Sequence, residues 1–180
     1  MPYTSKSLIV AKGTGKFYFA DKSATPIAAT WTEKFQTLKD SFSLTQEDGE
    51  TSETYVDQSD LPIKQTFKAG KMTLKFTIPN VAKAMLTDFF NTVTVSEAAP
   101  AGYEAVGVKV DAKKLNKMIK VEIAEQDLII IFPNLDIFRK FSGDNVNETP
   151  LGIEVTATVL ANTDAGAADI IFLNKMDGTA

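Results

Sequence analysis

The side chains of this chain that could do chemistry are mostly charged, and they are segregated by sign. Residues 40–60 carry seven carboxylates and no lysine or arginine, whereas residues 61–87 carry five lysines and no acid. The acids are Asp40, Glu47, Asp48, Glu50, Glu53, Asp57 and Asp60, and the lysines are Lys64, Lys68, Lys71, Lys75 and Lys83. Carboxylates can exchange protons or bind cations, but adjacent blocks of opposite sign favour contact between two protein surfaces. The alternative is a pair of solvated faces that keep the protein soluble.

Histidine and cysteine are both absent from the chain. Their absence removes disulfides, thiolate nucleophiles, Cys/His zinc sites and every histidine-based catalytic arrangement. The carboxylates fall on expected loops and exposed strand faces, where nothing raises a pKa, so no acid–base pair stands out. We therefore expect no catalytic residues, no cofactor and no metal, and a structural or binding protein rather than an enzyme.

Two short motifs resemble ligand sites only weakly. Gly13-Thr14-Gly15-Lys16 lacks two features of a phosphate loop, because Val10 stands where the first glycine belongs and Phe17 follows the lysine. The loop at Asp144-Asn145 and Asn147-Glu148 offers oxygen ligands for calcium, but its spacing matches no EF-hand. We interpret the first motif as a strand turn and the second as ordinary turn chemistry.

Length and composition are those of one globular domain spanning residues 1–180. The chain has 44% hydrophobic residues, a formal net charge of −4 and a pI of about 4.9. An acidic chain is a poor candidate for tight nonspecific nucleic-acid binding. No apolar run is long enough to span a bilayer, and residues 1–16 lack a signal-peptide pattern, so we expect no membrane partner.

Hydrophobic alternation with a period of two dominates the chain and predicts strands. The expected strands lie at 17–19, 42–45, 51–56, 63–67, 72–78, 106–110, 119–123, 128–132, 153–159 and 170–173. Pro133 should end the strand at 128–132. One helix is expected from Asn80, as N-cap, to Asn91. The predicted fold is mainly β: an antiparallel β-sandwich or partly closed barrel with one flanking α-helix.

The first predicted hairpin lies in the acidic block and turns at Asp48-Gly49, a strong hairpin signal. This turn places Glu47 opposite Glu50 and Phe42 opposite Tyr55. Like charges directly opposite each other are destabilising by on the order of 0.2–1 kcal/mol. The acidic tip should therefore be loosely held until a partner orders it.

The second predicted hairpin runs from Ile63 to Ile78 and turns at Ala69-Gly70. Its register sorts apolar from basic side chains almost completely, since a slip of one residue would invert both faces. The expected apolar pairs are Phe67–Met72, Gln65–Leu74 and Ile63–Phe76, and the expected exposed pairs are Lys68–Lys71, Thr66–Thr73 and Lys64–Lys75. The lysine pairs protect an edge from aggregation or receive an acidic surface.

The order of these parts resembles the tail tube (major tail) proteins of long-tailed bacteriophages. A short aromatic strand follows a glycine turn, then come a long polar hairpin or loop at about 40–62, the amphipathic hairpin and one helix. Several strands follow, including 128–135, and the Thr-rich strand Ile153–Leu160. The resemblance covers about residues 12–173 and depends on the order of elements, because the family has no short invariant motif.

The resemblance implies a virion protein of the phage tail, assembled in the host cytoplasm. It implies hexameric rings that stack into a tube, with other tail proteins as partners and DNA only as passing cargo. The family's long loop contacts the next ring, and the matching segment here is Asp40–Pro62. Lysines facing the lumen would conflict with DNA passage unless acids neutralise them or another subunit covers them.

The sequence therefore predicts self-assembly, with Glu47, Asp48, Glu50 and Glu53 on one side and Lys64, Lys68, Lys71 and Lys75 on the other. The two blocks can pair between subunits or within one. The alternatives are a monomeric β-sandwich binding module for carbohydrate or protein, with Tyr3, Trp31 and Tyr103 as candidate contacts, and another virion component such as a tail terminator.

Overall fold

The computed structural model describes residues 15–57, 59–110, 115–143, 150–164 and 166–174. The strands are β1 (Gly15–Asp21), β2 (Thr32–Phe35), β3 (Ser43–Gln46), β4 (Glu50–Val56), β5 (Ser59–Lys68), β6 (Met72–Ile78), β7 (Asn91–Val93), β8 (Gly107–Lys109), β9 (Leu115–Ile123), β10 (Leu128–Ser142), β11 (Gly152–Val159) and β12 (Ile171–Asn174). The helix is α1 (Lys83–Phe89), and a 3₁₀ turn, η2 (Ala124–Gln126), joins β9 to β10. The mainly β prediction with one α-helix is confirmed over the described residues.

The main sheet is antiparallel throughout, with the strand order β2-β1-β9-β10-β11-β6-β3. Strand β12 pairs with the first part of β10, on Leu128–Ile131, and β11 pairs with the last part, on Leu135–Ser142. Strands β4 and β5 form a separate two-stranded sheet, as do β7 and β8. The two ends of the main sheet, β2 and β3, are not paired with each other, so the sheet is not a closed barrel.

The main sheet curls over its own inner face, and aromatic rings fill the space between its ends. The ring of Phe17 in β1 lies 5.6 Å from the ring of Phe76 in β6, and Phe35 in β2 stacks on Phe76 at 5.4 Å. Phe89 of α1 joins them, at 5.3 Å from Phe19. Because β1 and β6 are separated by three strands in the sheet, these contacts require the sandwich-like curl.

Strand β10 continues through Pro133, where the sequence predicted its end. The register against β9 shifts between Phe132 and Leu135, so the proline lies in a bulge. Proline lacks a backbone N–H and is tolerated in sheets at such irregularities. The inner run is buried on both faces from Ile130 to Leu135, as the continuous apolar sequence predicted.

Helix α1 is shorter than predicted and starts later. Its N-cap is Ala82 rather than Asn80, and it ends at Phe89. The Asn80 side chain accepts a hydrogen bond from the Ala82 backbone N–H at 2.8 Å, so it forms a turn just before the helix instead of capping it. Met85 and Phe89 are buried, which places the apolar stripe against the core.

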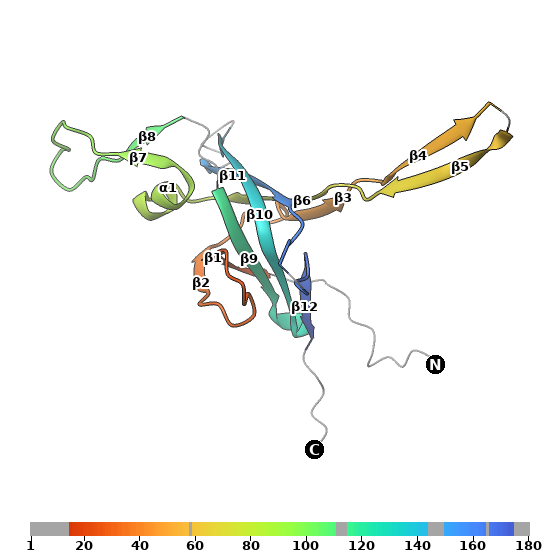
Figure 1. Ribbon diagram of the computed structural model, residues 1–180. Coiled ribbons are helices and arrows are strands. Elements are labelled where there is room, and N and C mark those ends of the chain that lie inside the picture. The colour runs from red at the N-terminus through yellow and green to blue at the C-terminus, as the bar shows by residue number, and fades with distance from the viewer. Residues whose placement is uncertain (1–14, 58, 111–114, 144–149, 165, 175–180) are drawn as a thin grey trace, which may run out of the picture.

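Two hairpins project from this body, on opposite sides in Figure 1. The β4–β5 hairpin, coloured orange to yellow, extends away from the core on one side, and β7–β8 with its connecting loop extends on the other. Among the residues of β4 and β5 whose burial the structure describes, none belongs to the buried core. We call residues 50–68 the arm.

Candidate functional site

The arm brings one acid and one lysine of the two blocks opposite each other within one subunit. Glu50 lies opposite Lys68, and Thr54 lies opposite Lys64. Opposite charges in directly facing positions stabilise an antiparallel pair by roughly 0.2–1 kcal/mol. Part of the acidic block is therefore paired with part of the basic block inside one chain.

The first predicted hairpin is wrong, because Asp48-Gly49 is not its turn. Strand β3 pairs with β6, and β4 pairs with β5 instead of with β3. Glu47 donates its backbone N–H to the carbonyl of Lys71 at 2.9 Å, so it is not opposite Glu50. Phe42 lies against the core ring of Phe17 at 5.3 Å, not against Tyr55.

The second predicted hairpin is wrong for the same reason. Ala69-Gly70 connects β5 to β6 without pairing them, so Lys68 does not face Lys71 and Lys64 does not face Lys75. Lys75 lies between Ser43 of β3 and Thr156 of β11. The expected ladder of lysine pairs does not form.

The arm continues the β3–β6 ladder in the same register. Gln46 is opposite Met72, and Glu50 is opposite Lys68, four residues further along both strands. Between the two ladders lie Gly49 and Gly70, where the backbones of the two segments approach each other very closely. A Cβ atom on Gly70 would lie 1.8 Å from the carbonyl oxygen of Glu47. We call this the glycine crossing; it allows two sheets to follow each other along one long hairpin.

The arm has one apolar face and one polar face, because side chains alternate along each strand and directly opposed residues share a face. Glu50, Ser52, Thr54, Lys64, Thr66 and Lys68 make up the polar face. The opposite face, which we call the apolar face, carries Tyr55, Leu61, Ile63 and Phe67, which are 53%, 75%, 62% and 69% exposed, together with Thr51, Glu53 and Gln65. The sequence predicted the sorting on β5 correctly but expected Phe67 to pair with Met72 and Ile63 with Phe76 of β6, and β5 pairs with β4 instead.

Glu53 is the centre of a small hydrogen-bonded cluster in the middle of the apolar face. Its carboxylate accepts hydrogen bonds from the Tyr55 hydroxyl and from the Gln65 side chain, the latter at 3.0 Å. The hydrogen bond to Glu53, with a smaller effect of burial, raises the pKa of Tyr55 above its usual 10.0. Glu53, predicted as an interface acid, thus binds side chains of its own subunit and orders the arm.

The remaining predicted acid of the site, Asp48, lies at the glycine crossing. Its carbonyl oxygen would be 2.8 Å from a Cβ atom on Gly70. Glu47, Asp48 and Lys71 therefore mark the base of the arm, whereas Glu50, Glu53, Lys64 and Lys68 lie along it. Lys75 is separate from them on the main sheet.

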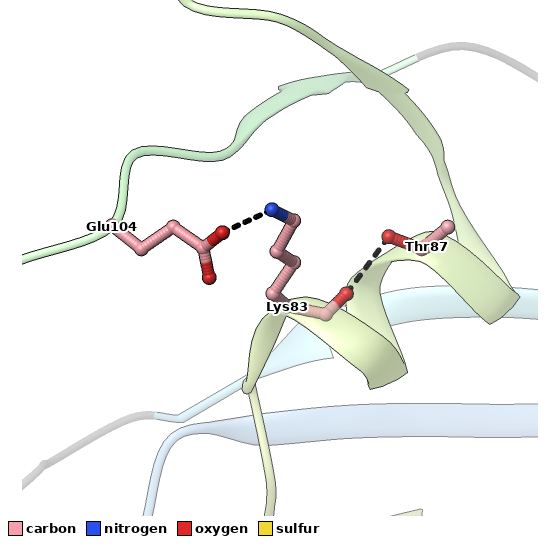
Figure 2. Close-up of polar contacts among 3 residues, drawn as sticks. All are labelled: Lys83, Thr87 and Glu104. Carbon is pink, nitrogen blue, oxygen red and sulfur yellow. Dashed lines mark hydrogen bonds and ion pairs between the residues drawn. The ribbon is translucent and has the colours of Figure 1, made fainter.

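The second projection is fixed to the helix by an ion pair. Figure 2 shows Lys83, the first residue of α1, with its ammonium directed at the carboxylate of Glu104 in the loop between β7 and β8. The Thr87 hydroxyl donates to the Lys83 carbonyl at 2.9 Å, one turn along the helix. Both charged side chains are more than half exposed, so this pair contributes at most about 1 kcal/mol and acts mainly to orient the loop.

The described residues contain no cluster of three or more acidic groups able to hold a metal ion. Within the same residues, no helix is both long and apolar enough to cross a bilayer. The loop at 144–148, which we interpreted as ordinary turn chemistry, lies outside the described residues, as do Gly13 and Thr14 of the glycine motif. Gly15 and Lys16 of that motif begin β1.

Comparisons with protein-family models and with curated proteins find no match to this chain.

Proposed function

We propose that this chain is a non-enzymatic structural subunit of a phage tail tube, which self-assembles into stacked rings around a channel for DNA. The observation that carries the proposal is the apolar face of the arm, exposed on a hairpin that projects from the body. Isolated two-stranded hairpins are marginal in water, and contiguous exposed apolar residues mark interaction surfaces. A second copy of the chain would cover this face.

In this proposal the arm contacts a different surface of the second copy, so the association is heterologous. Heterologous contacts generate closed rings or open helical stacks, which is the geometry of a tube. The resemblance to tail tube proteins in the order of elements supports the same assignment, with the arm in the place of the loop that reaches the next ring.

In this proposal the outward face of β3, β6 and β11 lines the channel. Core residues such as Leu74 and Phe76 alternate with the side chains of this face, which is rich in hydroxyl groups: Ser43, Thr45, Thr77, Thr156 and Thr158, with Thr73 buried between Thr45 and Thr158. Of the five lysines in residues 61–87, Lys75 alone belongs to it. Lys140 of β10 is paired with Glu154 at 3.1 Å. A face made mainly of hydroxyl groups, with few charges, would bind DNA phosphates weakly.

The first test is whether the purified protein assembles, measured by sedimentation velocity and electron microscopy. Rings or tubes are the expected result. A strict monomer at high concentration would overturn the proposal and favour the binding module.

The second test compares two substitutions that add the same charge to opposite faces of the arm. Ile63→Glu should abolish assembly, because a carboxylate on the apolar face would lose its hydration when a second copy covers it. Thr66→Glu, on the polar face, should leave assembly unchanged. Both positions are exposed, so the thermal unfolding midpoint of each variant should stay close to that of the parent protein. Equal assembly by the two variants would contradict the role given to the apolar face.

A further inference from the structure

A cleft lies where the start of β1, the end of β9 and the segment leading into β3 meet. Its volume is about 730 Å³, within the range of sites that bind a group of side chains or a small ligand. Phe17, Phe35 and Phe42 line it together with Val121 and Ile123. Phe17, Phe35, Val121 and Ile123 are buried and form the base of the cleft, whereas the ring of Phe42 is 38% exposed and is the apolar side chain that a docked segment would contact first.

One wall of the cleft, residues 36–40, is held rigidly by β6. Leu38 donates its backbone N–H to the Thr77 carbonyl at 2.8 Å. The Ser41 hydroxyl accepts from the Thr77 N–H at 3.1 Å and donates to the Leu38 carbonyl at 2.7 Å. A cleft whose wall is already ordered costs little conformational entropy to fill.

The mouth of the cleft and the arm carry complementary charge. Lys16, Lys39 and Asp40 line the cleft, with one more positive than negative charge. Residues 50–68 carry four acids and two lysines, so the arm has a formal charge of −2. Asp57, between β4 and β5, is exposed at the far end of the arm.

The arm and the cleft of one subunit are separated by the length of β3. Phe42, in the cleft, precedes this strand, and the glycine crossing follows it. The arm then extends away from the body (Figure 1). An arm in this orientation reaches the cleft of a neighbouring copy rather than its own.

We propose that the apolar face of one subunit's arm docks in the Phe17–Phe35–Phe42 cleft of a second copy, with Lys16 and Lys39 contacting the acidic far end of the arm. This inference rests on the self-assembly proposed above and names the surface that receives the arm. Each copy then offers one arm and one cleft, so the contact repeats from copy to copy.

The absence of cysteine makes cross-linking a clean test. Protein carrying Ile63→Cys on the apolar face is mixed with protein carrying Gln36→Cys at the cleft, and the mixture is oxidised. A second mixture replaces Ile63→Cys with Thr66→Cys on the polar face, and both are repeated with Thr37→Cys as a second cleft position. Because a disulfide requires close approach of the two residues, mixed dimers should form with Ile63→Cys and not with Thr66→Cys.

Equal cross-linking from both faces of the arm, or none from either, would overturn the docking. A third protein carries both Ile9→Cys and Gln36→Cys in one chain. If this protein forms an intramolecular disulfide and the mixtures form no mixed dimers, the chain's own N-terminal segment occupies the cleft and the docking is overturned.

A charge exchange gives a second readout. Lys39→Glu should weaken association about tenfold, because it places like charges in contact. Adding Asp57→Lys to that variant should restore part of the loss. Unchanged association of Lys39→Glu together with no face-selective cross-link would contradict the inference.

The outcomes separate this inference from the tail-tube proposal. Rings or tubes without the face-selective cross-link leave the proposed function standing and remove the cleft as receptor. Closed dimers with the face-selective cross-link keep the cleft as receptor and overturn the tube.

Discussion

Asn134 shows how one buried amide connects the central strand to a neighbouring loop. It lies in the bulge beside Pro133 and is 7% exposed. Its side chain donates to the Ala161 carbonyl and accepts from the Asn116 side chain, both at 2.9 Å, and its carbonyl accepts from the Leu160 N–H at the same distance. The bulge interrupts the pairing of β10 with β9, while the Asn134 carbonyl continues the β10–β11 register and its side chain connects Asn116 with the chain after β11.

Replacing Asn134 with alanine should lower the free energy of unfolding by about 1–3 kcal/mol, because the partners of its side chain lose their hydrogen bonds in a buried place. Denaturant unfolding followed by fluorescence or circular dichroism measures the loss. The matched control is Asn80→Ala, which removes one exposed hydrogen bond to Ala82 and should cost no more than about 1 kcal/mol. Equal losses of unfolding free energy at the two positions would show that the buried hydrogen bonds of Asn134 stabilise the protein no more than an exposed one.

At the level of elements, the glycine crossing controls the direction of the arm. Gly70→Ala would place its new methyl group against the backbone of Glu47, which cannot move aside as a flexible side chain could. We expect the ladder to break at Glu47–Lys71, with a loss of about 1–3 kcal/mol from overpacking and a failure to assemble. Hydrogen exchange should show faster exchange in β4 and β5 than in the parent protein. Ala69→Ser, at the adjacent exposed position, should behave like the parent protein.

The glycine crossing also explains why the sequence predicted the positions of the strands well but predicted poorly which strands pair with each other. Alternation correctly located β1, β6, β9 and β11, and it sorted Ile63 and Phe67 from Lys64 and Lys68. Alternation depends only on the strand's own geometry, so it assigns faces without choosing a partner. Asp48-Gly49 and Ala69-Gly70 have the composition of tight turns, but close backbone approach also requires glycine.

The candidate site was predictable in part. The polar segment at 40–62 overlaps the projecting arm, yet the arm starts at Glu50 and continues to Lys68. Strand β3, inside the predicted segment, belongs to the main sheet. The exposed apolar face could not be predicted, because a buried face and a face that awaits a partner have the same pattern of residues.

At the scale of the whole molecule, the core and the arm are separable. The hydrophobic residues that the structure describes as buried all lie outside residues 50–68. Replacing residues 48–70 by Asn-Gly would join Glu47 to Lys71 through a two-residue turn in the native register of β3 and β6.

This shortened protein should fold with nearly the same thermal midpoint as the parent and remain monomeric. Sedimentation velocity and thermal unfolding monitored by circular dichroism test both expectations together. A shortened protein that unfolds far below the parent would show that the arm contributes to the stability of the body. One that still forms rings or tubes would show that assembly does not need the arm.

The shared register of the arm and the β3–β6 ladder also determines how the molecule would carry mechanical load. Strand β6 pairs with β11, and β11 pairs with the long central strand β10. Tension applied at the far end of the arm passes along continuous backbone, through the glycine crossing, into β6. There it acts along the strands, so the hydrogen bonds between β6 and β11 share it in shear instead of opening one after another. In a tube whose subunits are joined through such arms, the hydrogen bonds of the main sheets, loaded in shear, would resist stretching.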